Sequence, residues 1–312
     1  MARWLVTGGA GFIGSHLAVA LLDRGETVRV ADDLSTGQPA NLALLDGRGE
    51  VLTGDLADIE FARAATRGVD VVLHQAAIPS VPRSVADPLT SHRANVDATL
   101  AVLVGAREAG VRRVVYAASS SAYGDTPELP KREDMVPNPL SPYALQKLIG
   151  EQYLQLFTRL YGLDTVSIRY FNVFGPRQDP SSPYSGVIAL FVTRLLAGLP
   201  PLIIGDGEQT RDFTYVDNVV DGVLKAAVAP DASGRVINVA TGRQISINQL
   251  AQALQRLLGT NLVPQFAESR AGDVRDSLAD IGLARQVLGY EPRISFEEGL
   301  RRTVDWYRAP HA

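Results

Sequence analysis

The protein has 312 residues, of which 46% are hydrophobic and 21% are charged, a composition typical of a soluble globular chain long enough for two lobes. The net charge of −4 gives no bias towards nucleic acid or acidic membranes, and the absence of cysteine excludes disulfides and thiolate chemistry. The 4 histidines lack metal-ligand spacing, no stretch approaches the ~20 apolar residues of a bilayer span, and the N-terminus has no signal-peptide layout. We therefore expect a cytoplasmic protein without a metal site and with neither a membrane nor a nucleic-acid partner.

The first half of the chain alternates apolar strand patterns with amphipathic helix patterns. A strand is predicted at 3–7 and a helix from the following glycine-rich turn to about Arg24. Further strands are predicted at 27–32, 50–54, 70–74, 113–119 and 165–170, with helices near 58–66, 90–109 and 142–161. Such alternation predicts an α/β fold whose parallel sheet is covered by helices on both faces.

The second half begins with a cluster of turn residues at 175–186, which is typical of the entrance to another lobe. An apolar strand at 235–240 is expected to return to the first sheet, so that the two domains interleave. The sequence thus predicts a nucleotide-binding domain at 1–171, to which about 213–242 return. A smaller α/β substrate-binding domain is formed mainly by 172–312.

A glycine-rich turn follows the first strand and opens the first helix. Gly8, Gly11 and Gly14 would allow a tight turn, close approach to a pyrophosphate and close packing of helix on sheet. The second strand ends at Asp32, where a ribose-binding carboxylate is expected. Such a carboxylate accepts from both adenosine hydroxyls and repels a 2′-phosphate, which favours NAD over NADP. The pattern predicts a Rossmann-type, doubly wound sheet.

Asp55 follows the third strand in the sequence Gly54-Asp55-Leu56. Its side chain is placed either to meet the adenine amine or to cap the next helix. The sequence leaves both interpretations open.

Tyr143 and Lys147 lie four residues apart after Ser141-Pro142, a pattern typical of a helix start. Residues at this spacing share a helix face, so the phenol and the ammonium become neighbours. A nearby positive charge favours phenolate, so we expect a lowered tyrosine pKa and a usable base. Only Lys131, Lys147 and Lys225 are lysines among the 30 basic residues, which suggests that a compact ammonium is needed here.

Several separated motifs together resemble the extended short-chain dehydrogenase/reductase superfamily, and within it the NAD-dependent UDP-sugar 4-epimerases. The resemblance covers nearly the whole chain. The motifs are Thr7-Gly8-Gly9-Ala10-Gly11-Phe12-Ile13-Gly14, His74-Gln75-Ala76-Ala77, Ser119-Ser120-Ser121-Ala122-Tyr123-Gly124, the Tyr143/Lys147 pair, Arg169-Tyr170-Phe171-Asn172-Val173-Phe174-Gly175-Pro176, Arg211-Asp212-Phe213 and Arg270-Ala271-Gly272-Asp273-Val274.

The resemblance implies removal of a hydride from carbon 4 of the sugar and its return to the other face. Tyr143 would then take the hydroxyl proton, and Lys147 would hold the nicotinamide ribose and keep Tyr143 ionised. A hydroxyl of the 119–121 run would relay the proton. The family motif has one more residue before Tyr-Gly, so we favour Ser120 for the chemistry and Ser121 for lining the sugar pocket.

The same resemblance implies the ligand contacts. NAD would be contacted by Gly8, Gly11, Phe12, Ile13, Gly14, Asp32, Ser35, Thr36, Gly37, Asp55, Leu56, Gln75, Ala76, Ala77, Asn95, Tyr143, Lys147 and Phe171. The UDP-sugar would be contacted by Arg83, Ser121, Asn172, Gln178, Gly186, Val187, Arg211, Arg270, Asp273 and Ser277, with Arg211 and Arg270 on the diphosphate and Asp273 on the uridine ribose.

The serine run favours epimerisation over the sister reactions of the superfamily. Related 4,6-dehydratases carry an Asp-Glu pair there and decarboxylases a glutamate. In this chain the run that begins at Ser119 has no acidic residue until Asp125. The alternatives left open are a UDP-glucuronate 4-epimerase, another nucleotide-sugar oxidoreductase or dehydratase, and a non-catalytic NAD-binding protein. Retention of both Tyr143 and Lys147 opposes the last.

The choice of sugar depends on the size of the pocket residues. In the subgroup acting on N-acetylated UDP-hexosamines, the pocket positions correspond to Pro79, Ser121, Asn172, Gln178, Gly186 and Ser277. A tyrosine in place of Ser277 closes the N-acetyl space in some relatives, whereas serine leaves it open; Pro79 is larger than expected. We therefore expect a UDP-GlcNAc/UDP-GalNAc 4-epimerase that also accepts UDP-glucose and UDP-galactose. By analogy, the helices near 90–109 and 142–161 would pair in a homodimer.

Overall fold

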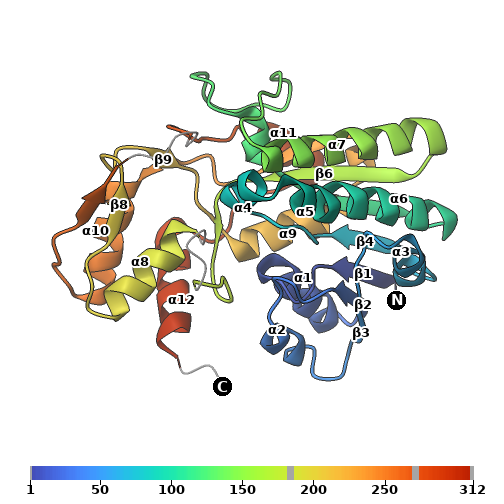
Figure 1. Ribbon diagram of the computed structural model, residues 1–312, viewed down its shortest axis with the longest axis horizontal. Helices are drawn as coiled ribbons and strands as arrows, with labels where there is room; N and C mark the ends of the chain where they lie inside the picture. Colours follow the sequence, from blue (N-terminus) through green and yellow to red (C-terminus); the bar gives the residue numbers. More distant parts are fainter. Residues whose placement is uncertain (1, 181–185, 269–273, 310–312) are drawn as a thin grey trace.

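A computed structural model describes residues 2–180, 186–268 and 274–309. At its centre is a 7-stranded parallel sheet with the order β11-β6-β5-β4-β1-β2-β3 (Figure 1). The strands are β1 (Arg3–Thr7), β2 (Thr27–Asp32), β3 (Glu50–Thr53), β4 (Val71–His74), β5 (Arg113–Ser119), β6 (Asp164–Tyr170) and β11 (Val236–Val239). Because all neighbouring pairs are parallel, the predicted doubly wound α/β fold is confirmed.

Helices cover both faces of this sheet and divide its core in two. One core contains residues of α1 (Phe12–Asp23), α9 (Val216–Ala226) and α11 (Gly282–Leu288), and the other contains residues of α3 (Ile59–Thr66), α6 (Ala98–Glu108) and α7 (Pro142–Tyr161). Alternate residues of a strand point to opposite faces, so Val6 packs in the first core and Leu5 in the second. Burial on both faces explains the continuous apolar runs of the strands.

Short elements connect the layers. The helix predicted near 90–109 is divided into α5 (Pro88–His92), the π-helical turn η1 (Arg93–Asp97) and α6. The other short elements of this lobe are α2 (Pro39–Ala43), α4 (Val81–Ala86), the 3₁₀ turn η2 (Ser120–Tyr123) and the 3₁₀ turn η3 (Pro230–Ala232). Among the described residues, no helix is both long and apolar enough to cross a bilayer.

The second lobe is smaller and lies beside one end of the sheet, at the left of Figure 1. Its helices are α8 (Val187–Leu196), α10 (Ile247–Leu258) and α12 (Phe296–Arg308). Its strands pair as β8 (Leu202–Ile204) with β13 (Gln265–Ala267), β9 (Thr210–Arg211) with β12 (Ile245–Ser246), and β7 (Val173–Phe174) with β10 (Thr214–Tyr215). Between them the chain returns to the first sheet, because β11 pairs with β6. The domain boundary expected after residue 171 stays a prediction.

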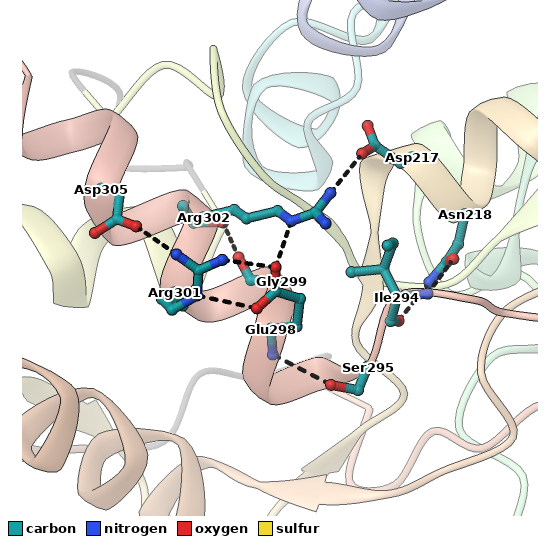
Figure 2. A network of polar contacts seen from close by, with 10 residues as sticks. Asp217, Asn218, Ile294, Ser295, Glu298, Gly299, Arg301, Arg302 and Asp305 are labelled. Carbon is teal, nitrogen blue, oxygen red and sulfur yellow. Dashed lines mark hydrogen bonds and ion pairs between the residues drawn. The ribbon is translucent and has the colours of Figure 1, made fainter.

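A polar network joins α12 of the second lobe to the start of α9, which lies against the main sheet (Figure 2). Arg302 donates to Glu298 at 2.7 Å within α12 and reaches Asp217 of α9 at 3.4 Å. Asn218 donates to the Ile294 carbonyl and accepts from its N–H, at 2.8 and 3.0 Å. These contacts hold α12 of the second lobe against the start of α9 in the first lobe.

Candidate active site

A cavity of about 1450 Å³ lies at the carboxyl ends of the parallel strands and is lined by residues of both lobes. The strand order changes direction between β1 and β4, the place where such sheets bind nucleotides. The predicted site residues that line it are Gly8, Gly11, Phe12, Ile13, Gly14, Asp32, Ser35, Thr36, Gly37, Asp55, Leu56, Gln75, Ala76, Ala77, Arg83, Ser120, Ser121, Tyr143, Lys147, Phe171, Asn172, Gln178, Gly186, Val187, Arg211 and Ser277. The predicted Arg270 and Asp273 lie outside the described residues.

The glycine-rich turn leaves no room for side chains beside its backbone. Gly8 adopts φ +66°, and a Cβ atom there would lie 2.7 Å from the Ala76 nitrogen. A Cβ atom on Gly14 would lie 2.1 Å from the Gly8 carbonyl oxygen. Gly11 directly precedes α1, whose N-terminal amides face an anion favourably. This cradle fits the pyrophosphate of a dinucleotide.

Asp32 ends β2 and is held in place by backbone donors. Its two carboxylate oxygens accept from the N–H groups of Ala10 at 2.9 Å and Leu34 at 2.8 Å. Burial raises the Asp32 pKa, and these hydrogen bonds oppose the increase. A carboxylate oxygen has two lone pairs, so each retains acceptor capacity for a ribose hydroxyl. The residues present therefore fit the adenosine half of NAD.

The structure rejects one of the two interpretations of Asp55, because Asp58 caps α3 instead, by accepting from the Glu60 N–H at 2.9 Å. One carboxylate oxygen accepts from the Ala57 N–H at 2.8 Å, which is a local turn contact. The other accepts from Arg93 at 2.7 Å, and the residue also lines the cavity. Asp55 therefore holds a turn that precedes the helix cap, and an adenine contact stays a prediction.

Asn95, predicted among the cofactor contacts, is not among the residues that line the cavity and lies behind its wall, so a contact with NAD stays a prediction. Its amide oxygen accepts from the Ile78 N–H at 2.8 Å, and its amide nitrogen donates to Gln146 at 2.8 Å. The side chain is 1% exposed. Asn95 therefore fixes the segment after β4, which supplies the cavity residues near Ala77.

Tyr143 and Lys147 occupy the first turns of α7, whose start agrees with the predicted signal. Ser141 caps the helix by accepting from the Ala144 N–H at 3.2 Å, and Pro142 is the first helical residue. The Lys147 ammonium is buried, donates to the Ala117 carbonyl at 2.8 Å and lies 4.8 Å from the centre of the Tyr116 ring. Burial lowers the Lys147 pKa to about 7.

The Tyr143 pKa moves against the expectation from the sequence. Burial raises it, and a hydrogen bond with Ser119 opposes the increase. Desolvation penalises phenolate wherever a phenol leaves water, and the i,i+4 spacing carries no information about that burial. The predicted lowering of the Tyr143 pKa is therefore wrong for this structure.

The serine placed beside Tyr143 is Ser119, not Ser120, the serine favoured from the motif. Ser119 is the last residue of β5 and lies two positions after Ala117, which holds Lys147, so both sit at the strand's carboxyl end. The Ser121 hydroxyl donates to the Ser119 hydroxyl at 2.8 Å, while Ser120 lines the cavity. The sequence did contain a signal for Ser119: the strand predicted at 113–119 ends at this residue, and side chains at the carboxyl end of such a strand face the site.

The sugar side of the cavity is formed by loops of both lobes. Asn172 adopts φ +32°, and Ser277 is 9% exposed and donates its N–H to Thr210. A Cβ atom on Gly186 would lie 2.8 Å from the Gln178 amide nitrogen, so glycine leaves room for that side chain. These small or polar side chains leave space around a sugar ring.

Lys131 also lines the cavity, although the motif analysis did not assign it to the site. Its ammonium donates to the Thr126 hydroxyl at 2.6 Å, and its N–H donates to the Leu278 carbonyl at 2.7 Å. It ties the loop after η2 to the segment that carries Ser277. The scarcity of lysine was the signal that could have marked it.

Comparisons with known proteins agree with this geometry. The NAD dependent epimerase/dehydratase family matches residues 4–240. The chain is 43% identical to a UDP-glucose 4-epimerase of Mycolicibacterium smegmatis, with 98% of each chain covered. It is also similar to two solved structures. A UDP-N-acetylglucosamine 4-epimerase of Methanobrevibacter ruminantium in complex with UDP-N-acetylmuramic acid is 40% identical, with a TM-score of 0.94 and 98% of each chain covered.

The second structure is a UDP-glucose 4-epimerase of Thermus thermophilus in complex with NAD. It is 37% identical, with a TM-score of 0.90, and the match covers 98% of this chain and 99% of that one. Identity at this level over whole chains, together with the family match over residues 4–240, agrees with the fold described above. The chain belongs to the NAD dependent epimerase/dehydratase family.

Proposed function

We propose that this protein catalyses the reversible 4-epimerisation of a UDP-hexose with bound NAD, and that UDP-GlcNAc and UDP-GalNAc are its preferred pair. The observation that carries epimerisation is the meeting of Tyr143, Lys147 and Ser119 at the carboxyl edge of β5. These side chains supply a base, a cation and a proton relay. A 4-epimerase needs no further acid or base.

In the proposed reaction, Tyr143 removes the proton from the hydroxyl on carbon 4 of the sugar. The chemistry that NAD supplies when bound is reversible acceptance of a hydride from that carbon. Ser119 has one hydroxyl proton, and by donating it to the phenolate oxygen it stabilises the ionised form of Tyr143. Lys147 favours the same ionised form through its charge. Once the 4-keto sugar has rotated, its opposite face would receive the hydride at carbon 4, which inverts that carbon, and Tyr143 returns the proton to the oxygen.

Dehydration is disfavoured because η2 supplies no carboxylate. It consists of Ser120, Ser121, Ala122 and Tyr123. The next acid, Asp125, accepts from the Arg275 N–H at 3.1 Å. Elimination needs a base beside the neighbouring sugar carbon, and the described residues of this segment do not offer one.

The small residues on the sugar side support the N-acetylated substrates. Ser277 is buried in the cavity wall, where a larger side chain would take up the space of an acetamido group. A relative similar along its whole length is a UDP-N-acetylglucosamine 4-epimerase, while others act on UDP-glucose. The proposal therefore includes activity on UDP-glucose and UDP-galactose.

The test is incubation of the purified protein, without added NAD, with UDP-GlcNAc, UDP-glucose or UDP-glucuronate in separate tubes. Proton NMR of the sugar signals identifies each product. Formation of UDP-GalNAc supports the whole proposal. Formation of UDP-galactose alone keeps the mechanism and rejects the interpretation of Ser277. Conversion of UDP-glucuronate alone, or no conversion even with added NAD, rejects the proposed hexose activity.

We propose that the protein acts in the cytoplasm as a homodimer. Exposed apolar side chains on α7 support the dimer: Leu145 is 48% and Leu160 is 67% exposed. A contiguous apolar patch on a helix surface is typical of an interface between subunits. Sedimentation of the purified protein at the mass of one chain would reject this assembly.

A further inference from the structure

Glu151 and Arg169 form a buried ion pair that the proposed reaction does not use. The Arg169 guanidinium donates to the two Glu151 carboxylate oxygens at 2.8 and 2.7 Å, and both side chains are 3% exposed. The guanidinium also lies 4.4 Å from the centre of the Tyr123 ring, a residue that lines the cavity. Burial of two charges is costly, so replacing one partner alone is strongly unfavourable.

This pair is one helical turn from Lys147 and anchors the same helix. Lys147 and Glu151 are four residues apart in α7, so they share the face that packs on the sheet. Lys147 bonds to Ala117 of β5, while Glu151 bonds to Arg169 of β6, which pairs with Ala118. Between the anchors, a Cβ atom on Gly150 would lie 2.3 Å from the Tyr116 hydroxyl oxygen. The helix is therefore held close to the strands at this point.

The charged and titratable groups around Lys147 come from four elements. They are Tyr143 and Glu151 on α7, Tyr116 on β5, His74 on β4, and Arg169 on β6 beyond Glu151. Burial lowers the His74 pKa to about 3, so that ring is neutral at working pH. Among these groups, Glu151 supplies the negative charge. It opposes the lowering of the Lys147 pKa by burial.

We propose that Glu151 is a positioning residue for Lys147. Together with Arg169 it fixes the height of α7 above the sheet, and its carboxylate holds the Lys147 ammonium in its protonated form. This inference rests on the proposed role of Lys147 beside the cofactor. It explains why a costly buried ion pair lies at this turn of α7.

The decisive measurement is the titration of Lys147 itself in the NAD-loaded protein. The chain has only the lysines Lys131, Lys147 and Lys225, so carbon-13 labelling of lysine gives a spectrum that Lys131→Arg and Lys225→Arg variants assign. We expect Glu151→Gln to move the Lys147 titration to lower pH by about one unit, because an anion one turn away is lost. The alkaline limb of kcat against pH should move with it.

The variant E151M/R169M separates positioning from a purely structural role. It removes both charges without leaving either unpaired, a change that proteins often tolerate in stability. We expect it to fold and to titrate Lys147 at lower pH than the parent. A parental titration in E151M/R169M would overturn the proposal, even if Glu151→Gln does not fold.

The control is the ion pair of Arg113 and Asp164, which joins the same two strands at their other ends with a contact of 2.8 Å. Asp164→Asn should lower stability and leave the Lys147 titration and the kcat profile in place. An equal displacement in this control would reject a specific role for Glu151. The Lys147 titration is measured without substrate and does not depend on catalysis. If the epimerase proposal fails, the parent protein will be inactive, and this result is distinct from the result of the titration.

Discussion

The Lys147 ammonium donates a hydrogen bond of 2.8 Å to the main-chain oxygen of Ala117, a residue 30 positions earlier in the chain. Ala117 lies two residues before the end of β5, at Ser119. This contact ties the start of α7 to the carboxyl end of β5. It brings Tyr143, Lys147 and Ser119 to one wall of the cavity, where a base, a cation and a hydroxyl are needed together.

Replacing Tyr143 with phenylalanine should remove the proton acceptor. We expect kcat to fall by about 10³-fold, because a positioned general base contributes on that order, while the thermal stability changes little. NMR of the sugar product measures the rate. The control is Tyr161→Phe at the end of the same helix, where the side chain is 50% exposed. Comparable losses in both variants would contradict the assignment.

Ser119 ends β5 and Ser120 begins η2, so alanine variants of these two adjacent serines can be compared directly. The Ser119 hydroxyl contacts Tyr143, so Ser119→Ala should reduce kcat by about 10²-fold and move the acid limb of the pH profile to higher pH. Ser120→Ala should keep most of the activity. The reverse order would restore the assignment made from the motif alone.

Asp32 should determine the choice between NAD and NADP. Asp32→Ser removes the carboxylate that repels a 2′-phosphate and weakens the hydrogen bonds to Ala10 and Leu34. We expect weaker NAD binding and a smaller preference for NAD over NADP, measured by calorimetric titration of both cofactors. Asp33→Ser, one residue further along, is the control. An unchanged cofactor preference in Asp32→Ser would show that the ribose lies elsewhere.

The pKa of Lys147 predicts a pH-dependent cost in stability. Burial lowers it from 10.5 to about 7, so between these values the unfolded chain binds more protons than the folded one. Stability from this group therefore rises with pH across that window, and the cost is largest below pH 7. Lys147→Met should exceed the parent in free energy of unfolding at neutral pH, with a difference that shrinks towards pH 10.

Denaturant titrations of both proteins at several pH values give this comparison. Lys225→Met controls for loss of a lysine outside the cavity. A difference between Lys147→Met and the parent that stays constant with pH would show that Lys147 is not desolvated as described. A more stable but inactive Lys147→Met is the expected trade between function and stability.

Ser277 should set the size limit of the sugar pocket. Ser277→Tyr fills the space beside the sugar, so activity on UDP-GlcNAc should fall by at least about 10²-fold, while that on UDP-glucose is largely kept. The ratio of kcat/KM for the two substrates measures the effect. Equal losses for both would place the acetamido group away from Ser277.

The sequence by itself determined the parallel sheet, the glycine cradle, the position of Asp32 and the place of Tyr143 and Lys147 in one helix. These features are local: strand and helix periodicities, a turn that needs glycine, and an i,i+4 spacing act over a few residues. The strands were located to within one residue for the same reason. Asp55 shows the limit, because the local pattern allowed it to cap the next helix, whereas Asp58, three residues later, makes that cap.

Only the tertiary structure decided which serine meets Tyr143, that Asn95 lies behind the cavity wall, and in which direction the Tyr143 pKa moves. Each of these depends on how far a side chain is removed from water and on which distant segment packs against it. Those quantities depend on contacts between β5, α7 and the second lobe, which are far apart in the sequence. A local sequence pattern therefore cannot predict them.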